Sequence, residues 1–442
     1  MAVLLLLMRS KQITIVLIVT LVIGVFDSSI LAQSKQKQRP KLKDFGFSLD
    51  RLKRDAPKKQ PVSRKDEMKS ETELDEGDVI RIESNLVTSE ISVLDDRGNL
   101  IQNLSPDELV VTEDGEPQKV VHFLRGDDKK IPRTIVLLID YSGSQLPYIR
   151  RSIDAAKVLV DKLLPLDVMA IVTDDVDLLI DFTNDKEKLK QKLESLFERT
   201  QAGRLGRSVQ YSALMATLNE AFSEEDLRPI IIFQTDGDQL GSLRDPVVGL
   251  EIPPDLPKHL RDEVVRRRER SAGSGVEFTL FDVYRTVERS RATVYTVIPG
   301  FRLLSKSQEE QVETLRKLQQ TMLIRDGKWS RKEQEKYKAI KDEWRIFSPA
   351  NLVFAAQEQL ITQQALHGVA SRAGGWTEFL EAPEQADGIY NRVLVDIDHR
   401  YIVGYYPTNK AHDGTKRKIK FFVKDHPEYK VVGRNWYYAP AQ

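Results

Sequence analysis

The sequence contains no cysteine. This absence excludes thiol catalysis, disulfide bonds and a lipoprotein anchor. Histidine is also scarce: the six His residues form neither an HExxH motif nor a close pair, which argues against a zinc site. Charge of one sign is not in excess either, because 67 Lys and Arg residues balance 67 Asp and Glu residues. Nothing in this balance indicates nucleic acid or an anionic surface as the main partner.

The first part of the chain has the layout of an export signal. Arg9 and Lys11 precede an apolar stretch over residues 13–26, and small residues follow up to Ala32. We therefore predict that residues 1–32 are a signal peptide, cleaved after Ala32, and that the protein is exported to the periplasm or secreted. The alternative is an uncleaved N-terminal membrane anchor, with the body facing outside the cytoplasm; the apolar residues before Met8 favour it.

With 442 residues the chain is long enough for two or three domains. Residues 33–78 are almost wholly polar, which predicts a disordered linker. Residues 79–126 alternate apolar and polar positions between turn signals at 96–99 and 113–116. This pattern predicts a small antiparallel β-rich module, similar to half of an immunoglobulin-like sandwich.

Residues 132–300 alternate short apolar runs with amphipathic stretches. The runs at 135–139, 230–234 and 293–298 are rich in β-branched residues and uninterrupted by charge, as in strands that are buried on both faces. The predicted fold class is α/β, with a doubly wound, mostly parallel sheet and helices on both faces. Charged insertions are expected at about 240–277 and at 303–349, followed by a C-terminal helix and β tail over 350–442.

Oxygen-bearing side chains stand where these predicted strands end. Asp140, Ser142 and Ser144 follow the first strand, Asp236 follows the strand at 230–234, and Ser208 precedes a helix. Because the carboxyl ends of parallel strands meet at one edge of a sheet, the five residues are candidate ligands of one divalent cation, Mg²⁺ or alternatively Mn²⁺ or Ca²⁺. Asp and Ser are also ordinary turn and cap residues. We interpret Asp174 and Asp175, at another strand end, as a solvated turn.

The order of these motifs resembles the von Willebrand factor type A (VWFA) domain, whose metal-ion-dependent adhesion site (MIDAS) uses DxSxS, a distant Thr and the Asp of TDG. Here the motifs are Asp140 to Ser144, Ser208 in the place of the Thr, and Thr235 to Gly237. The flanking stretches SVLDDRGNLIQNLSPDELVV and YIVGYYPTN resemble the exported bacterial "VWFA-related" family typical of acidobacteria. The resemblance implies a VWFA-type fold and a role in binding and scaffolding, without enzymatic activity.

Three functional hypotheses follow. The first is an exported adhesion or scaffold protein that captures an acidic residue of a protein partner through Mg²⁺. The second is a metal-free structural spacer in a cell-envelope complex. The third is a metal-dependent hydrolase, against which no His, Lys or Glu base stands in a motif beside the candidate ligands. We expect no enzymatic activity and no nucleic-acid partner.

Overall fold

The computed structural model describes residues 42, 45–49, 86–126, 131–146, 148–223, 226–244, 278–324 and 349–441, with isolated positions between 252 and 276. The predicted signal peptide (1–32) and most of the predicted linker (33–78) lie outside these residues. The chain divides into units 1–43 and 44–442, and every element named below belongs to the second unit. Within the described part, no helix is both long and apolar enough to cross a membrane.

A six-stranded sheet forms the centre of the α/β part. Its strand order is β10-β9-β8-β5-β6-β7, with all neighbours parallel except the edge strand β7. The strands are β5 (Arg133–Ile139), β6 (Val168–Thr173), β7 (Leu178–Thr183), β8 (Arg228–Gln234), β9 (Thr293–Pro299) and β10 (Thr377–Leu380). The predicted α/β fold class, a mostly parallel doubly wound sheet, is confirmed.

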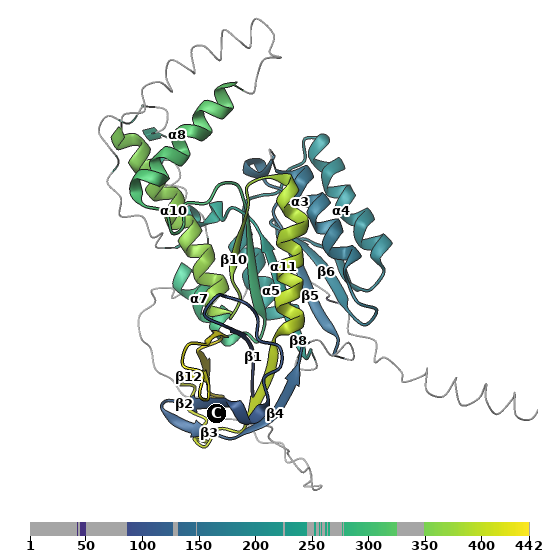
Figure 1. Cartoon of the computed structure of the whole chain (residues 1–442). Helices are drawn as coiled ribbons and strands as arrows, with labels where there is room; N and C mark the ends of the chain where they lie inside the picture. The colour runs from purple at the N-terminus through teal and green to yellow at the C-terminus, as the bar shows by residue number, and fades with distance from the viewer. Residues whose placement is uncertain are drawn as a thin grey trace, which may run out of the picture. The chain divides into compact units, whose positions relative to one another are not determined.

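Helices cover both faces of this sheet. On one face α3 (Ile149–Asp161) packs between α4 (Lys186–Gln201) and α11 (Ala386–His399), three helices that lie side by side in Figure 1. On the other face α7 (Leu280–Arg289) contacts α5 (Gln210–Glu220) and α10 (Pro349–Arg372), and α5 and α10 contact the sheet. Both faces of β5, β8 and β9 are therefore buried, which is why their sequences lack polar alternation.

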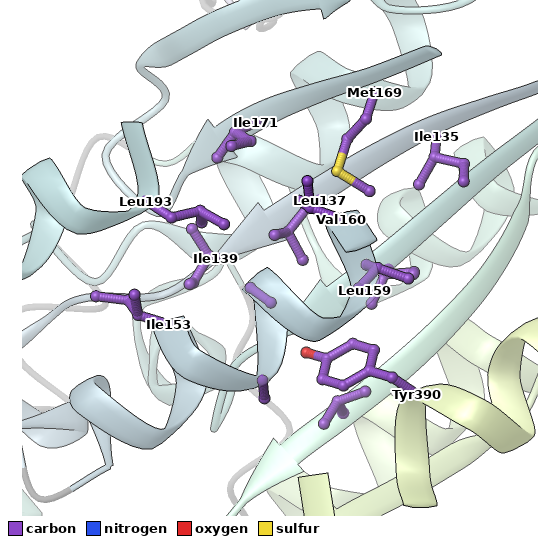
Figure 2. Packing of buried hydrophobic residues seen from close by; sticks show 14 of the residues in the cluster. Ile135, Leu137, Ile139, Ile153, Leu159, Val160, Met169, Ile171, Leu193 and Tyr390 are labelled. Atoms are coloured by element: carbon purple, nitrogen blue, oxygen red, sulfur yellow. The ribbon is translucent and has the colours of Figure 1, made fainter. Parts of the chain in front are cut away.

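The main core lies between the sheet and the layer of α3, α4 and α11. Ile135, Leu137 and Ile139 of β5 point into it and are fully buried, as Figure 2 shows. They meet residues of α3 such as Leu159, and Tyr390 of α11. Full burial of each such aliphatic side chain contributes about 1.5–3 kcal/mol, so this core supplies much of the free energy of folding.

Two four-stranded antiparallel sheets form a β-sandwich. One has the order β13-β1-β11-β4 and the other β14-β12-β2-β3. The strands are β1 (Val87–Leu94), β2 (Leu109–Glu113), β3 (Glu116–Gln118), β4 (Val120–Arg125), β11 (Tyr401–Tyr405), β12 (Lys416–Val423), β13 (Lys430–Gly433) and β14 (Trp436–Tyr438). The β-rich module expected at 79–126 is therefore only half of a module, and the C-terminal tail supplies its other half.

Two of the predicted domain assignments need correction. The α/β part does not end at residue 300, because β10 and α11 come from beyond it. Within the predicted disordered linker, residues 45–49 form a helical turn whose Gly46 and Ser48 N–H groups donate to the Glu220 carboxylate, at 2.7 and 2.9 Å. Of the two predicted charged insertions, α8 (Gln308–Ile324) confirms helix in the second; most of 240–277 and all of 325–348 lie outside the described residues.

One buried carboxylate ties the sandwich to the α/β part. Asp396 of α11 accepts hydrogen bonds from Ser92 Oγ of β1 at 2.5 Å, Tyr295 OH of β9 at 2.7 Å and Trp376 Nε1 at 3.2 Å, and pairs with Arg400 at 2.8 Å. Burial raises the pKa of Asp396, but Arg400 and the donated hydrogen bonds outweigh it and hold the pKa below its usual range. The carboxylate therefore stays charged and fully paired.

We expect Asp396→Asn to lower the free energy of unfolding by about 3 kcal/mol, because it leaves the buried Arg400 guanidinium without its counter-charge. Urea unfolding of the full chain at neutral pH measures the change. The control is Asp387→Asn on the same helix, where an exposed carboxylate lies 3.5 Å from Lys162 and contributes less than about 1 kcal/mol. Equal effects of the two substitutions would contradict this role of Asp396.

Candidate metal centre

The candidate site lies where the strand order of the sheet reverses. β6 continues the sheet on one side of β5 and β8 continues it on the other, and ligand sites of doubly wound sheets form at this switch point. Ile139 and Gln234 are the last register partners of β5 and β8, so Asp140 and Thr235 leave the sheet side by side. The Asp140 N–H donates to the Gln234 carbonyl at 3.0 Å, which fixes the start of this loop.

Asp140 is almost fully buried, and its carboxylate is held by three donors. Oδ1 accepts from the Ser142 N–H at 2.9 Å, and Oδ2 accepts from Gln210 Nε2 and Thr235 Oγ1, both at 2.8 Å. These donors fix the orientation of the Asp140 carboxylate at the edge of the sheet.

The two serines of the first motif lie on the short 3₁₀ turn η2 (Gly143–Gln145) and its N-cap. Ser142 is buried and Ser144 is exposed, and their Oγ atoms are 3.2 Å apart. Neighbouring oxygens in an octahedral shell around Mg²⁺ lie about 3.0 Å apart, given Mg–O distances near 2.1 Å. The spacing of the two hydroxyls therefore fits a shared cation.

Asp236 comes to the same edge from the loop after β8. Its Oδ2 accepts from Gln145 Nε2 at 2.6 Å, which links it to the η2 turn, and its Oδ1 accepts from the Asp238 N–H at 3.2 Å. Gly237 turns the chain here with φ of 78°, and a Cβ on it would lie 3.1 Å from Leu366 of α10. Only glycine meets both conditions without strain.

Ser208 is attached to the site through Asp174. The Asp174 carboxylate accepts from the Tyr141 N–H at 3.1 Å and from the Ser208 N–H at 2.8 Å, which draws the loop before α5 towards the DxSxS turn. Ser208 has φ of 54°, in the left-handed region. Gly206 passes so close to Asp174 that a Cβ atom on residue 206 would lie only 2.0 Å from the Asp174 Oδ1 atom. The structure thus ties the backbone of Ser208 to the site, while the role of its hydroxyl stays a prediction.

The interpretation of Asp174 and Asp175 as a solvated turn is wrong. Asp174 is fully buried, and Asp175 is partly buried and accepts from Tyr141 OH at 2.8 Å. The sequence analysis also missed the buried amides of Gln145 and Gln210, which orient the two candidate carboxylates. The sequence carried no signal for them, because neutral amides have no chemistry of their own.

The carboxylates repel one another in the protein without a cation. Burial, followed by the nearby Asp236 and Asp174 charges, raises the pKa of Asp140 to about 8. Burial also raises the pKa of Asp174 to about 6, although the Tyr141 and Ser208 N–H groups act in the opposite direction. Among the described residues, no three His, Cys, Asp or Glu side chains form a metal-binding group. The donor set that fits a cation consists instead of two carboxylates and serine hydroxyls, with the Gln145 Oε1 atom buried beside it without a partner.

No protein-family model matches the sequence, and no curated protein matches it. Solved structures are similar to the chain. One is a von Willebrand factor type A protein from Catenulispora acidiphila, with 10% identity over 82% of this chain and 76% of that one, at a TM-score of 0.31. Another is BatB from Bacteroides thetaiotaomicron, with 12% identity over 60% of this chain and 98% of that one, at a TM-score of 0.32.

A third similar structure is proximal thread matrix protein 1 from the mussel byssus, which has a zinc-occupied MIDAS motif. It is 12% identical over 60% of this chain at a TM-score of 0.30, and this chain spans about half of its length, 47%. VWFA proteins, the family that the sequence resembles, are thus among the structural neighbours. At these TM-scores the likeness says nothing about function, which has to be argued from the site itself.

We expect the free energy of unfolding in EDTA to fall by more than about 1 kcal/mol as the pH rises from 5 to 8, because a pKa shift of one unit corresponds to 1.36 kcal/mol. The pKa of Asp140 is near 3.8 when unfolded and about 8 when folded, so the folded state binds the extra proton across this window and loses stability as that proton leaves. Asp396, with a lowered pKa, is charged in both states throughout the window.

Urea unfolding at several pH values measures this slope. Asp140→Asn, which cannot titrate, reduces the slope, while Asp177→Asn, at an exposed loop carboxylate, leaves it unchanged. A wild-type slope that Asp140→Asn does not alter would contradict the assignment to Asp140.

Proposed function

We propose that this chain is a metal-dependent protein-binding or scaffold protein, in which the sheet edge holds a divalent cation that captures an acidic residue of a partner. One observation carries the proposal. The buried Asp140 carboxylate is fixed by three donors and stands at the start of a motif whose two serine hydroxyls are spaced like neighbouring metal ligands.

The chemistry of the donor set supports a hard cation. Asp140, Ser142, Ser144, Ser208 and Asp236 offer only oxygen atoms, which suit Mg²⁺, with Mn²⁺ and Ca²⁺ as the alternatives. Only two of these five groups carry a formal charge. The two carboxylates do no more than neutralise the two positive charges of the cation, and the serine hydroxyls add no charge. The bound ion therefore retains affinity for one more carboxylate.

The rim of the site suits a protein partner. Leu146, which follows the DxSxS motif, is 49% exposed, and Leu205, which precedes the Ser208 loop, is 37% exposed. Exposed leucines beside a polar centre are typical of a protein-binding surface. A carboxylate bound at the centre, with apolar contacts around it, is the arrangement that we propose.

The surroundings of the candidate ligands give no support to catalysis. The groups that contact the Asp140 and Asp236 carboxylates are side-chain amides, a threonine hydroxyl and backbone N–H groups, none of which acts as a base at neutral pH. We therefore propose no enzymatic activity. The location outside the cytoplasm, periplasmic or secreted, is part of the proposal and depends on the signal peptide predicted at residues 1–32.

We expect Mg²⁺ or Mn²⁺ to raise the unfolding midpoint of the full chain, since an ion at about 100 times its Kd stabilises the folded state by about 2.7 kcal/mol. Differential scanning calorimetry in EDTA and then in millimolar metal measures the shift. The double variant Ser142→Ala, Ser144→Ala loses the metal response, whereas Ser195→Ala, on α4 with its hydroxyl bonded to the Lys192 carbonyl, retains it.

A wild-type midpoint that neither Mg²⁺, Mn²⁺ nor Ca²⁺ moves would refute the metal site. That result would favour the metal-free structural spacer, the second hypothesis drawn from the sequence.

For the partner chemistry, we expect the full chain to bind immobilised decapeptides that contain one Asp or Glu at least tenfold more tightly in Mg²⁺ than in EDTA. Matched peptides with Asn or Gln at the same position show no such gain, because an amide brings no charge to the cation. Metal-dependent binding of the amide peptides to the same extent would contradict capture of a carboxylate.

A further inference from the structure

A second polar site lies away from the sheet edge, between the β-sandwich and the end of α7. It is a cavity of about 320 Å³ whose walls come from four stretches of the chain. They are the start of β1 (86–89), the end of α7 (288–291), the loop after β11 (406–412) and the segment around β14 (434–440), and Arg417 of β12 also lines the cavity. None of the candidate metal ligands belongs to these walls. The volume is that of a small-molecule site.

The walls carry a surplus of positive charge. Five cations line the cavity: Arg289, Arg291, Lys410, Arg417 and Arg434. The one acid among the lining residues, Glu288, is already engaged, because its carboxylate lies 2.7 Å from Lys416 Nζ and 3.4 Å from Arg372 Nε. An anion in the cavity would therefore meet unbalanced positive charge.

Arg434 shows this imbalance most clearly. Its guanidinium donates to the backbone carbonyls of Glu288 at 3.2 Å and Ala292 at 2.7 Å, and also to that of Ser290. These carbonyls satisfy its N–H groups but do not neutralise its charge. Burial lowers the pKa of Arg434 to about 10, which indicates that the neighbouring charges compensate poorly for the lost solvation.

Arg417 is a second cation with unused binding capacity. It is 2% exposed and pairs with Glu113 at 3.2 Å and with Asp413 at 3.7 Å, while its terminal nitrogens also donate to the carbonyls of Asn409 and Ala411. Its Nε atom is buried without any hydrogen-bond partner. An unmade hydrogen bond on a buried charged group is costly, so this cation is not fully compensated within the protein.

The rest of the lining is aromatic and apolar. Tyr406, Trp436 and Tyr438 contribute rings, and Leu86 and Val87 contribute aliphatic surface. The Arg289 guanidinium lies over the Tyr438 ring at 4.9 Å from its centroid, which holds this cation at the wall. The cavity therefore combines an apolar surface with cations that are already positioned.

We propose that this cavity binds an organic carboxylate with an aromatic body about the size of one amino acid. The carboxylate accepts from the arginines and Lys410, and the aromatic ring packs on the tyrosine and tryptophan side chains. Such a group occurs both in free aromatic acids and at the C-terminus of a peptide that ends in an aromatic residue. The proposal is independent of the metal site, since the two share no residue.

The test is isothermal titration calorimetry of the full chain in EDTA with N-acetyl-L-tyrosine, and with its uncharged analogue N-acetyl-L-tyrosinamide. We expect the acid to bind at least tenfold more tightly than the amide, because only the acid satisfies the cations. Equal affinities would overturn the proposed recognition of a charge. Absence of binding by the acid, and also by the peptide Ala-Ala-Ala-Tyr with a free C-terminus, would overturn the site.

The peptide arm separates the two sources of the ligand. If Ala-Ala-Ala-Tyr binds at least tenfold more tightly than N-acetyl-L-tyrosine, and the C-terminal amide of the peptide does not, the site takes a peptide terminus. Equal affinities of the peptide and the free acid indicate a free acid.

The double variant Arg289→Gln, Lys410→Gln removes two exposed cations and weakens binding of the acid about tenfold. The control Arg316→Gln, at an exposed position of α8, leaves it unchanged. Unchanged affinity in the double variant would contradict the assigned walls.

Discussion

The buried Asp396 carboxylate is the constraint on which the arrangement of the described chain depends. A carboxylate without solvent must be paired and hydrogen-bonded, and Asp396 meets this demand with groups from β1, β9, the residue before β10, and its own helix. Arg228 adds a second buried link, since it donates to Glu90 of β1 at 3.1 Å and to the carbonyls of Gly126 and Ile397. The sandwich is therefore joined to the α/β part by polar groups that have no alternative partners, rather than by a flexible connection.

The sequence predicted local elements well and long-range pairing poorly. The runs around Ile135, Ile230 and Val294 are apolar on both faces, and this pattern is specific enough for a buried parallel strand. The alternating pattern of β1, by contrast, reveals which face is buried but not which strand pairs with it. Its partner is β11, in which Tyr405 pairs with Val87 of β1. The two residues are more than three hundred positions apart in the sequence, and no local signal encodes their pairing. The end of the α/β part was placed too early for a similar reason, because β10 has four residues and follows a 24-residue helix.

At the candidate metal centre the sequence indicated the candidate ligands but not what holds them. Asp140 and Asp236 follow recognisable strands, and the topology of a parallel sheet then brings them to one edge. Asp174 stands at an equivalent place, yet its burial depends on Gly206 making room for its carboxylate, which composition alone does not reveal. Gln145 and Gln210 have neutral side chains with no chemistry of their own. Their contribution is to fix the orientation of charged neighbours, and it becomes visible only once the hydrogen bonds are known.

A net charge of zero conceals two regions of opposite sign. At the sheet edge, burial and the nearby Asp236 and Asp174 charges raise the pKa of Asp140, an environment that is short of positive charge. In the cavity beside α7, burial lowers the pKa of Arg434, and the Nε atom of the buried Arg417 has no hydrogen-bond partner. Each region is costly to the folded state by itself, because desolvated charge without a partner destabilises a protein. In both proposals a ligand of the opposite sign relieves this cost, so the same imbalance that lowers the stability of the free protein would supply the driving force for binding.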